Sequence, residues 1–324
     1  MTDAPFRSAL DLAAAIRARQ VGARELLDLY VDRIRRLGPR INAVVVRDEE
    51  AARAQADAAD AALAKGTLRG PLHGVPMTVK ESFDLAGHPT TWGLPDYREH
   101  RAAEDALAVR RLKAAGAVVF GKTNVPVLLA DWQSYNPIYG CTNNPWDVTR
   151  SPGGSSGGSA AALAAGLTAL EIGSDIGASI RNPAHYCGVY GHKPTWGICP
   201  PRGHGLDGDL TVTDIAVIGP LARSAGDLRV ALEAMAGPDE IEAGAWTLTL
   251  PAARRQRLKD WRVAVMLDDR NAEVDRSVQD AIQRLADFLS SAAGGTTDRA
   301  PIAAYRALVE LLDRDWITRT YSLV

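Results

Sequence analysis

One stretch of the chain, SPGGSSGGSAAALAAGLTALEIGSDIGASIRNPAHYCGVYGHKPT at residues 151–195, constrains the fold more than any other. The chain has 29 glycines, and they are concentrated between residues 153 and 191. Glycine lacks a Cβ, so it adopts positive φ readily and lets the backbone approach other groups closely. The stretch therefore predicts tight turns around a short helix of small residues at 158–166.

Helical and strand patterns alternate along the rest of the chain. Helices are predicted over 8–37, in two amphipathic pieces that Gly38-Pro39 ends, and over 49–65, 104–115, about 224–236 with Ser224 as cap, about 275–292, and the start of 302–324. Strands are predicted over 41–46, 75–81, 117–120, 167–172 and 262–267. This alternation indicates an α/β sheet with helices on its faces. At roughly 150 residues per domain, 324 residues fit two domains or one large α/β unit.

Composition excludes several classes of protein. Hydrophobic residues make up 46% of the chain and charged residues 23%, which is ordinary for a globular protein. The net charge is −2, so the chain as a whole has no excess of positive charge to bind nucleic acid. The three cysteines show no CxxC spacing, which favours a reducing compartment and offers no metal site. The N-terminus has no apolar signal region, and no segment is apolar enough to span a bilayer. We therefore expect a cytoplasmic protein without a membrane, nucleic-acid or metal partner.

Three short motif matches fail on their context. GAVVFGKT (116–123) fits a phosphate-loop pattern, but its four central residues are strand formers, so an ATPase is a distant alternative. GHGLDG (203–208) fits a dinucleotide pattern but follows no strand, and GGSSG (153–157) fits a nucleophile elbow but lacks the strand ahead of its serine. The downstream histidines His185, His192 and His204 are interpreted as structural or surface residues.

Several ordered segments together resemble the amidase signature family. They are HGVPMTVKESFDLAG (73–87), GKTNVP (121–126), NPIYGCTNNPWD (136–147) and the glycine-rich stretch at 151–195. The resemblance covers roughly residues 70–225. It implies an α/β fold in which helices cover both faces of a mixed, twisted β-sheet. It also implies a cofactor-free hydrolase that forms an acyl-enzyme.

Carried over position by position, the resemblance implies a Ser–cis-Ser–Lys triad of Ser179, Ser155 and Lys80. A serine hydroxyl is a weak nucleophile that needs a base, and a lysine whose pKa is lowered by burial can be that base. The resemblance further implies a backbone oxyanion hole at Ile176, Gly177, Ala178 and Ser179, and a supporting network of Ser156, Asp175 and Arg181. Leu129 aligns with the acyl pocket of the family, and Trp132 lies nearby.

Two departures from the family pattern stand out. Ala178 occupies a position where the family usually has glycine, so if this residue needs positive φ, alanine adds strain of about 1 kcal/mol or more. The chain is also shorter than usual. We expect one domain over 1–324, with a helical N-terminal part (about 1–65), a catalytic core (about 70–225) and a C-terminal part that is incomplete relative to the family.

The sequence thus predicts an amidase that hydrolyses linear, non-peptide amides, with esters and carbamates as further substrates of the same chemistry. The expected partner is a small-molecule substrate, and a homodimer is compatible with the sequence. Two alternatives remain open. One is the glutamine-hydrolysing A subunit of an amidotransferase, and the other is a catalytically impaired, amidase-like binding protein.

Overall fold

The computed structural model describes residues 3–206, 213–255, 257–267, 273–291 and 296–298. The chain divides into two compact units, residues 1–248 and 249–324. The helices of the first unit are α1 (Ala9–Arg17), α2 (Ala23–Ile41), α3 (Glu49–Ala64), α4 (Leu107–Ala114), α5 (Gly157–Ala164), α6 (Arg181–Cys187) and α7 (Ala225–Met235). Its strands are β1 (Val44–Arg47), β2 (Pro76–Lys80), β3 (Val118–Thr123), β4 (Tyr135–Asn136), β5 (Gly140–Cys141), β6 (Glu171–Asp175), β7 (Tyr190–Gly191) and β8 (Val217–Ala222).

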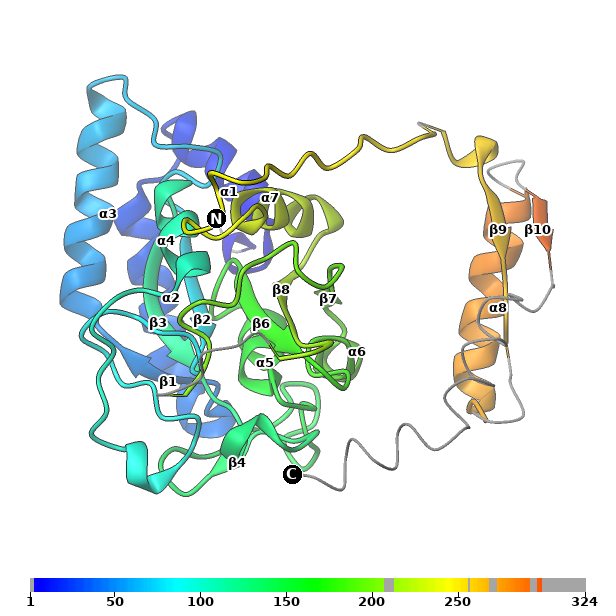
Figure 1. The fold of residues 1–324 in the computed structure, drawn as a ribbon, viewed down its shortest axis with the longest axis horizontal. Helices are drawn as coiled ribbons and strands as arrows, with labels where there is room; N and C mark the ends of the chain where they lie inside the picture. The colour runs from blue at the N-terminus through cyan, green and yellow to red at the C-terminus, as the bar shows by residue number, and fades with distance from the viewer. Residues whose placement is uncertain (1–2, 207–212, 256, 268–272, 292–295, 299–324) are drawn as a thin grey trace. The chain divides into compact units, whose positions relative to one another are not determined.

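Two groups of strands form the centre of the first unit. One has the order β1-β3-β2, with β2 parallel and β1 antiparallel to β3, and the other has the antiparallel order β6-β8-β7. The groups meet where β2 lies beside β6, and there the Thr78 N–H donates to the Thr168 hydroxyl at 3.0 Å. Helices α2, α3 and α4 pack beside β2 and β3, whereas α6 and α7 pack beside β7 and β8 (Figure 1). The predicted α/β fold with a mixed sheet is confirmed.

Side-chain caps begin three of the predicted helices. The side chains of Ser8, Asp48 and Ser224 each accept the backbone N–H three residues further along, which satisfies a donor that the first helical turn leaves free. Apolar residues at helical spacing then turn one face of each helix into the core, as the sequence predicts.

The predicted end of the second helix is wrong. Pro39 lies inside α2, which continues to Ile41, so the following strand begins at Val44 rather than at residue 41. A proline removes one N–H from the helix, but the last turn still closes because the Asn42 N–H donates to the Gly38 carbonyl at 2.7 Å. Asn42 itself takes the left-handed conformation, with φ 52°.

The segment that matches the phosphate-loop pattern is a buried strand. All six residues of β3 are buried, and they pair with β1 and β2. A Cβ on Gly121 would lie 2.5 Å from the Val46 carbonyl oxygen on β1, so this glycine allows two strands to approach rather than a phosphate. The buried strand that the sequence predicts within this segment is therefore confirmed. The predicted strand at 167–172 is shifted, because β6 begins only at Glu171.

The second unit contains β9 (Arg262–Ala264), α8 (Arg276–Ser291) and β10 (Thr296–Asp298), and β9 pairs in parallel with β10. The predicted helix over about 275–292 is confirmed, but only the first half of the predicted strand over 262–267 is a strand, because β9 ends at Ala264. The expectation for 302–324 lies outside the described residues. Among the described residues, no helix combines the length and the apolar character that crossing a bilayer requires.

Candidate active site

Lys80 stands at the end of β2 with its side chain fully buried. Its Nζ donates to the Ser155 hydroxyl at 2.6 Å and to the Ser174 hydroxyl at 2.9 Å. Burial lowers the pKa of Lys80 to about 7, although the charges of Asp175 and Glu171 oppose that shift. A lysine with this pKa has a substantial neutral fraction near neutral pH, which is the property that a general base needs.

Ser155 lies in the turn that leads into α5. The peptide bond between Gly154 and Ser155 is cis, as the resemblance implies. A Cβ on Gly154 would clash with the Gln133 carbonyl oxygen, so only glycine fits before this serine. The sequence thus places a hydroxyl beside Lys80 through a turn that its glycines make possible.

Ser156, the residue before α5, ties this turn to the rest of the site. Its hydroxyl accepts from the Ser174 N–H and donates to the Ser174 carbonyl, both at 3.4 Å. Its backbone N–H donates to the Ser179 carbonyl at 3.1 Å. The start of α5 is therefore joined both to β6 and to the loop that carries Ser179.

Ser174 is a member of this network that the sequence reasoning missed. Its hydroxyl accepts from Lys80, and its backbone groups hold Ser156. The strand predicted over 167–172 ends before Ser174, so only the structure shows this serine inside the buried strand β6. Buried hydroxyls need partners, so such a serine points to a neighbouring polar group.

Ser179 follows β6 by four residues and is 5% exposed. Its hydroxyl has no hydrogen-bond partner among the described residues, so no direct bond joins it to Ser155. The link between the two turns is instead the backbone bond from Ser156 to Ser179. Of the three predicted triad residues, the structure brings Lys80 and Ser155 into contact, whereas Ser179 is joined to their turn only through its backbone carbonyl.

Asp175 and Arg181 form an ion pair that braces the loop around Ser179. The two guanidinium contacts to the carboxylate are 3.0 and 2.9 Å long, and the Asp175 side chain is fully buried. Burial alone would raise the pKa of Asp175, but hydrogen bonds from Arg181 and from the Ile180 N–H outweigh it and hold that pKa below its usual value. The carboxylate is therefore anionic and fixes several loop donors at once.

The predicted oxyanion hole needs one correction. The Ala178 N–H donates to Asp175 Oδ1 at 2.9 Å, so it is already used within the loop rather than presented to a substrate. The N–H groups of Ile176, Gly177 and Ser179 have no hydrogen-bond partner among the described residues. Ala178 has φ 80°. The alanine that stands where the family usually has glycine therefore does adopt a positive φ, which is strained for a residue with a Cβ.

Comparison with known proteins shows the family to which the chain belongs. A sequence model of the family described as Amidase matches residues 25–312. The chain belongs to the amidase family. The chain is 40% identical to an indoleacetamide hydrolase of Bradyrhizobium diazoefficiens over 87% of its own length and 54% of the relative. It is 38% identical to the A subunit of a glutamyl-tRNA(Gln) amidotransferase of Acidothermus cellulolyticus over 89% and 58% of the two chains.

Solved structures of the family share the fold. A fatty acid amide hydrolase superposes with a TM-score of 0.85 at 27% identity, and the match covers 94% of this chain and 55% of that one. A peptide amidase in complex with chymostatin gives a TM-score of 0.77 at 30% identity over 90% and 61% of the two chains. The chain thus spans a little over half the length of these two curated relatives.

Leu129, the predicted acyl-pocket residue, is half-buried in an irregular turn. Its N–H donates to the Pro126 carbonyl at 3.2 Å, and it has φ 58°. The hydrogen bonds of the described residues do not connect it to the triad. Trp132, by contrast, contacts the loop that carries Ser179, because its indole N–H donates to the Gly177 carbonyl at 2.7 Å.

His204 contacts the segment that follows Lys80 in the sequence. Its Nε2 lies 3.0 Å from the Ser82 hydroxyl, and its ring packs against Phe83 with the centroids 4.6 Å apart. Burial lowers the pKa of His204 to about 3, and the charge of Lys80 adds to the effect. Among the described residues, no group of three His, Cys, Asp or Glu side chains could hold a metal ion.

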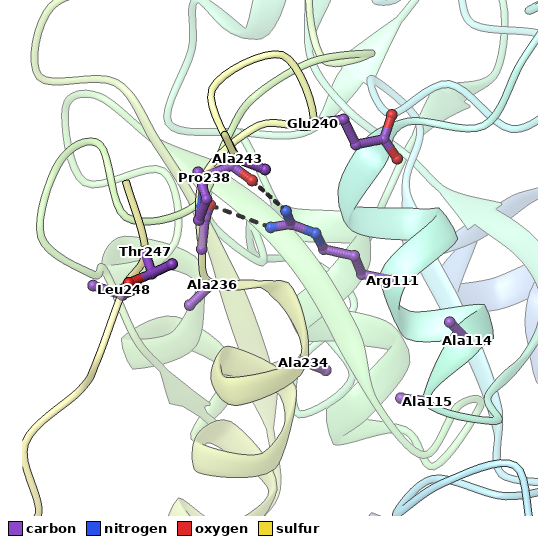
Figure 2. Close-up of a pocket in the computed structure, with 11 residues that line it drawn as sticks. Arg111, Ala114, Ala115, Ala234, Ala236, Pro238, Glu240, Ala243, Thr247 and Leu248 are labelled. Atoms are coloured by element: carbon purple, nitrogen blue, oxygen red, sulfur yellow. Dashed lines mark hydrogen bonds between the residues drawn. The ribbon is translucent and has the colours of Figure 1, made fainter. Parts of the chain in front are cut away.

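A pocket elsewhere in the first unit contains none of the predicted site residues. It lies between α4 and the segment that follows α7 (Figure 2). The guanidinium of Arg111 donates to the carbonyls of Met235, Gly237 and Pro238 at 2.6, 3.3 and 2.5 Å, which caps the end of α7. Its guanidinium therefore holds the segment that follows α7.

Proposed function

We propose that the described core carries an amide-hydrolysing site in which Ser179 is the nucleophile, Ser155 relays its proton and Lys80 is the base. The observation that carries this proposal is the fully buried Lys80 Nζ at 2.6 Å from the Ser155 hydroxyl. A charged ammonium is disfavoured in such surroundings, and the neutral amine is basic enough to accept a proton. Membership of the amidase family and similarity to amide hydrolases support the same chemistry.

In the first half of the proposed reaction, the Ser179 oxygen attacks the amide carbon. The Ser179 proton passes to Ser155 while the Ser155 proton passes to Lys80. The proton then returns through Ser155 to the leaving amine, the C–N bond breaks, and an ester to Ser179 remains. Water releases the acid by the same proton path, with water in place of the serine hydroxyl.

Negative charge on the former carbonyl oxygen needs donors during this attack. The free N–H groups of Ile176, Gly177 and Ser179 are the groups of the loop that remain available for it. In hydrolases of this general kind, losing one such donor costs about 3–4 kcal/mol of transition-state stabilisation. The proposed hole therefore excludes Ala178, whose N–H holds Asp175.

The proposed substrate is a linear amide with an apolar acyl group. Relatives named as indoleacetamide hydrolase and as fatty-acid amide hydrolase 2 of Homo sapiens, 41% identical over 71% of this chain and 45% of that protein, support an apolar acyl group. The exposed side chain of Leu128, next to the predicted pocket residue Leu129, is chemically suited to one. We also propose a cytoplasmic location and a homodimer, and the support for both comes from the sequence alone.

The glutamine-hydrolysing component of an amidotransferase is the second candidate, because relatives with that name match at 38% identity. The two candidates differ in substrate choice. An amidotransferase component would hydrolyse glutamine with strong preference and in a stable complex with a partner, whereas the proposed amidase would prefer apolar primary amides on its own.

The experiment for the proposal is turnover of a panel that contains an apolar primary amide and glutamine. We expect the apolar amide to be hydrolysed and Ser179→Ala to abolish this, because the nucleophile is lost. Ser8→Ala, which changes only the exposed cap of α1, is the matched control and should retain turnover. Undiminished hydrolysis by Ser179→Ala would overturn the proposed function, and hydrolysis of glutamine alone would favour the second candidate.

A further inference from the structure

Trp132 makes an unusual contact for an exposed side chain. Its exposed fraction is 63%, yet its indole N–H donates to the Gly177 carbonyl at 2.7 Å. Gly177 belongs to the segment Ile176–Ser179, which we call the oxyanion loop. A surface tryptophan therefore holds the backbone of the loop that the proposed function uses.

The same peptide unit is held from its other edge. The Gly177 carbonyl and the Ala178 N–H belong to one trans peptide, and that N–H donates to Asp175 Oδ1 at 2.9 Å. A trans peptide is planar, and its C=O and N–H point in opposite directions. Trp132 and Asp175 therefore clamp the Gly177–Ala178 peptide from two sides.

The two hydrogen bonds of the clamp hold Ala178 in a backbone conformation that alanine disfavours. Ala178 has φ 80°, a conformation that residues with a Cβ rarely adopt. Rotating the peptide plane would move Ala178 toward negative φ, with a compensating change in ψ of Gly177, which tolerates almost any backbone angle. That rotation would break both hydrogen bonds and turn the carbonyl oxygen toward the Asp175 carboxylate.

Asp175 alone gives only half of this restraint. Its carboxylate is fixed by Arg181 and by the Ile180 N–H, so it stays in place whichever way the peptide turns. The indole N–H is the donor that the Gly177 carbonyl would lose on rotation. The carbonyl side of the clamp thus depends on Trp132.

We propose that Trp132 is a positioning residue that latches the oxyanion loop. By fixing the Gly177–Ala178 peptide, it fixes the directions of the free N–H groups of Gly177 and Ser179 on either side of that peptide. This inference rests on the proposed function of the same site. It predicts that loss of the indole N–H lowers the rate of the chemical step rather than the affinity for the amide.

The first test compares Trp132→Phe with Trp146→Phe. Trp146 is the matched control, because it is 75% exposed and also donates its indole N–H to a backbone carbonyl, that of Cys187, at 2.8 Å. With an apolar primary amide, we expect Trp132→Phe to lower kcat at least tenfold and change KM less than twofold, and Trp146→Phe to change neither by more than twofold. An unchanged kcat, or an effect confined to KM, would contradict the latch, and the latter would make the indole a substrate contact.

The second test uses the coupling between the latch and the strained alanine. Glycine at position 178 has no preference for leaving φ 80°, so the loop gains less by rotating when the latch is lost. We expect the kcat loss from Trp132→Phe to be at least threefold smaller in an Ala178→Gly background. A kcat loss in the Ala178→Gly background that is equal to or larger than the loss in the Ala178 background would overturn the proposal.

A third readout does not depend on turnover. The Ala178 N–H is protected from hydrogen exchange by Asp175, and that protection requires the peptide to stay in its orientation. Trp132→Phe should raise the exchange rate of this amide at least tenfold, whereas Trp146→Phe should leave it unchanged. An unchanged exchange rate in Trp132→Phe would refute the latch. Because this readout does not use turnover, it tests the latch separately from the proposed function, which the turnover of Ser179→Ala tests.

Discussion

Lys80 shows how one buried residue sets the chemistry that a site can perform. Burial lowers its pKa to about 7, and the negative charges of Asp175 and Glu171 oppose this shift without cancelling it. The sequence alone could predict this lysine through its motif, but not Ser174, whose hydroxyl is its second partner at 2.9 Å. That partner depends on where β6 lies beside β2, which is a property of the tertiary structure.

The first prediction concerns pH. Because the neutral form of Lys80 is the proposed base and its pKa is about 7, kcat/KM should fall about tenfold per pH unit below that pKa and level off above it. The measurement is a profile of amide hydrolysis between about pH 5.5 and 8.5, with unfolding checked at each pH. A flat profile, or a rate that rises as the pH falls, would remove the role of base from Lys80.

The second prediction concerns Ala178. An alanine at positive φ is strained, and the penalty exceeds the unfolded-state entropy that alanine saves relative to glycine. Ala178→Gly should therefore raise the free energy of unfolding by up to about 1 kcal/mol. Ala54→Gly, on the exposed face of α3, is the control and should lower it by about 1 kcal/mol. Denaturant unfolding measures both, and equal losses in the two variants would show that position 178 carries no strain.

At the scale of elements, local patterns predicted most helices and strands but not their ends. The cap at Ser224 is predicted from the sequence and confirmed, because a short-range hydrogen bond decides it. The end of α2 could not be predicted in this way, because the helix continues through Pro39 to Ile41 rather than ending before Gly38. The oxyanion loop shows the same limit, since no sequence pattern reveals that the Ala178 N–H is already taken by Asp175.

The third prediction tests the contact between β1 and β3. A Cβ on Gly121 would meet the Val46 carbonyl oxygen at 2.5 Å, and backbone cannot move aside easily. Gly121→Ala should therefore lower the free energy of unfolding by about 1–3 kcal/mol. Gly244→Ala is the matched control, since a Cβ there meets nothing within 4 Å. Similar stabilities of the two variants would mean that the strands are not as close as described.

At the scale of the whole molecule, several separate segments of one chain meet in one network. Lys80 comes from β2, Ser155 from the turn before α5, Ser174 from β6 and Ser179 from the loop after it. The order of these segments in the sequence predicted the family and the triad, because a long set of ordered motifs rarely arises by coincidence. The substrate could not be predicted in the same way, because pocket shape depends on packing that no motif encodes.

The central claim is that Ser179 is the nucleophile and that Lys80 activates it through Ser155. The most direct measurement is reaction with a serine-reactive fluorophosphonate at about pH 8, where Lys80 is mostly neutral, followed by mapping of the labelled peptide by mass spectrometry. The account predicts a single label on Ser179, formed at least a hundredfold more slowly in Lys80→Met. A label on Ser155 or elsewhere, or an undiminished rate in Lys80→Met, would contradict it.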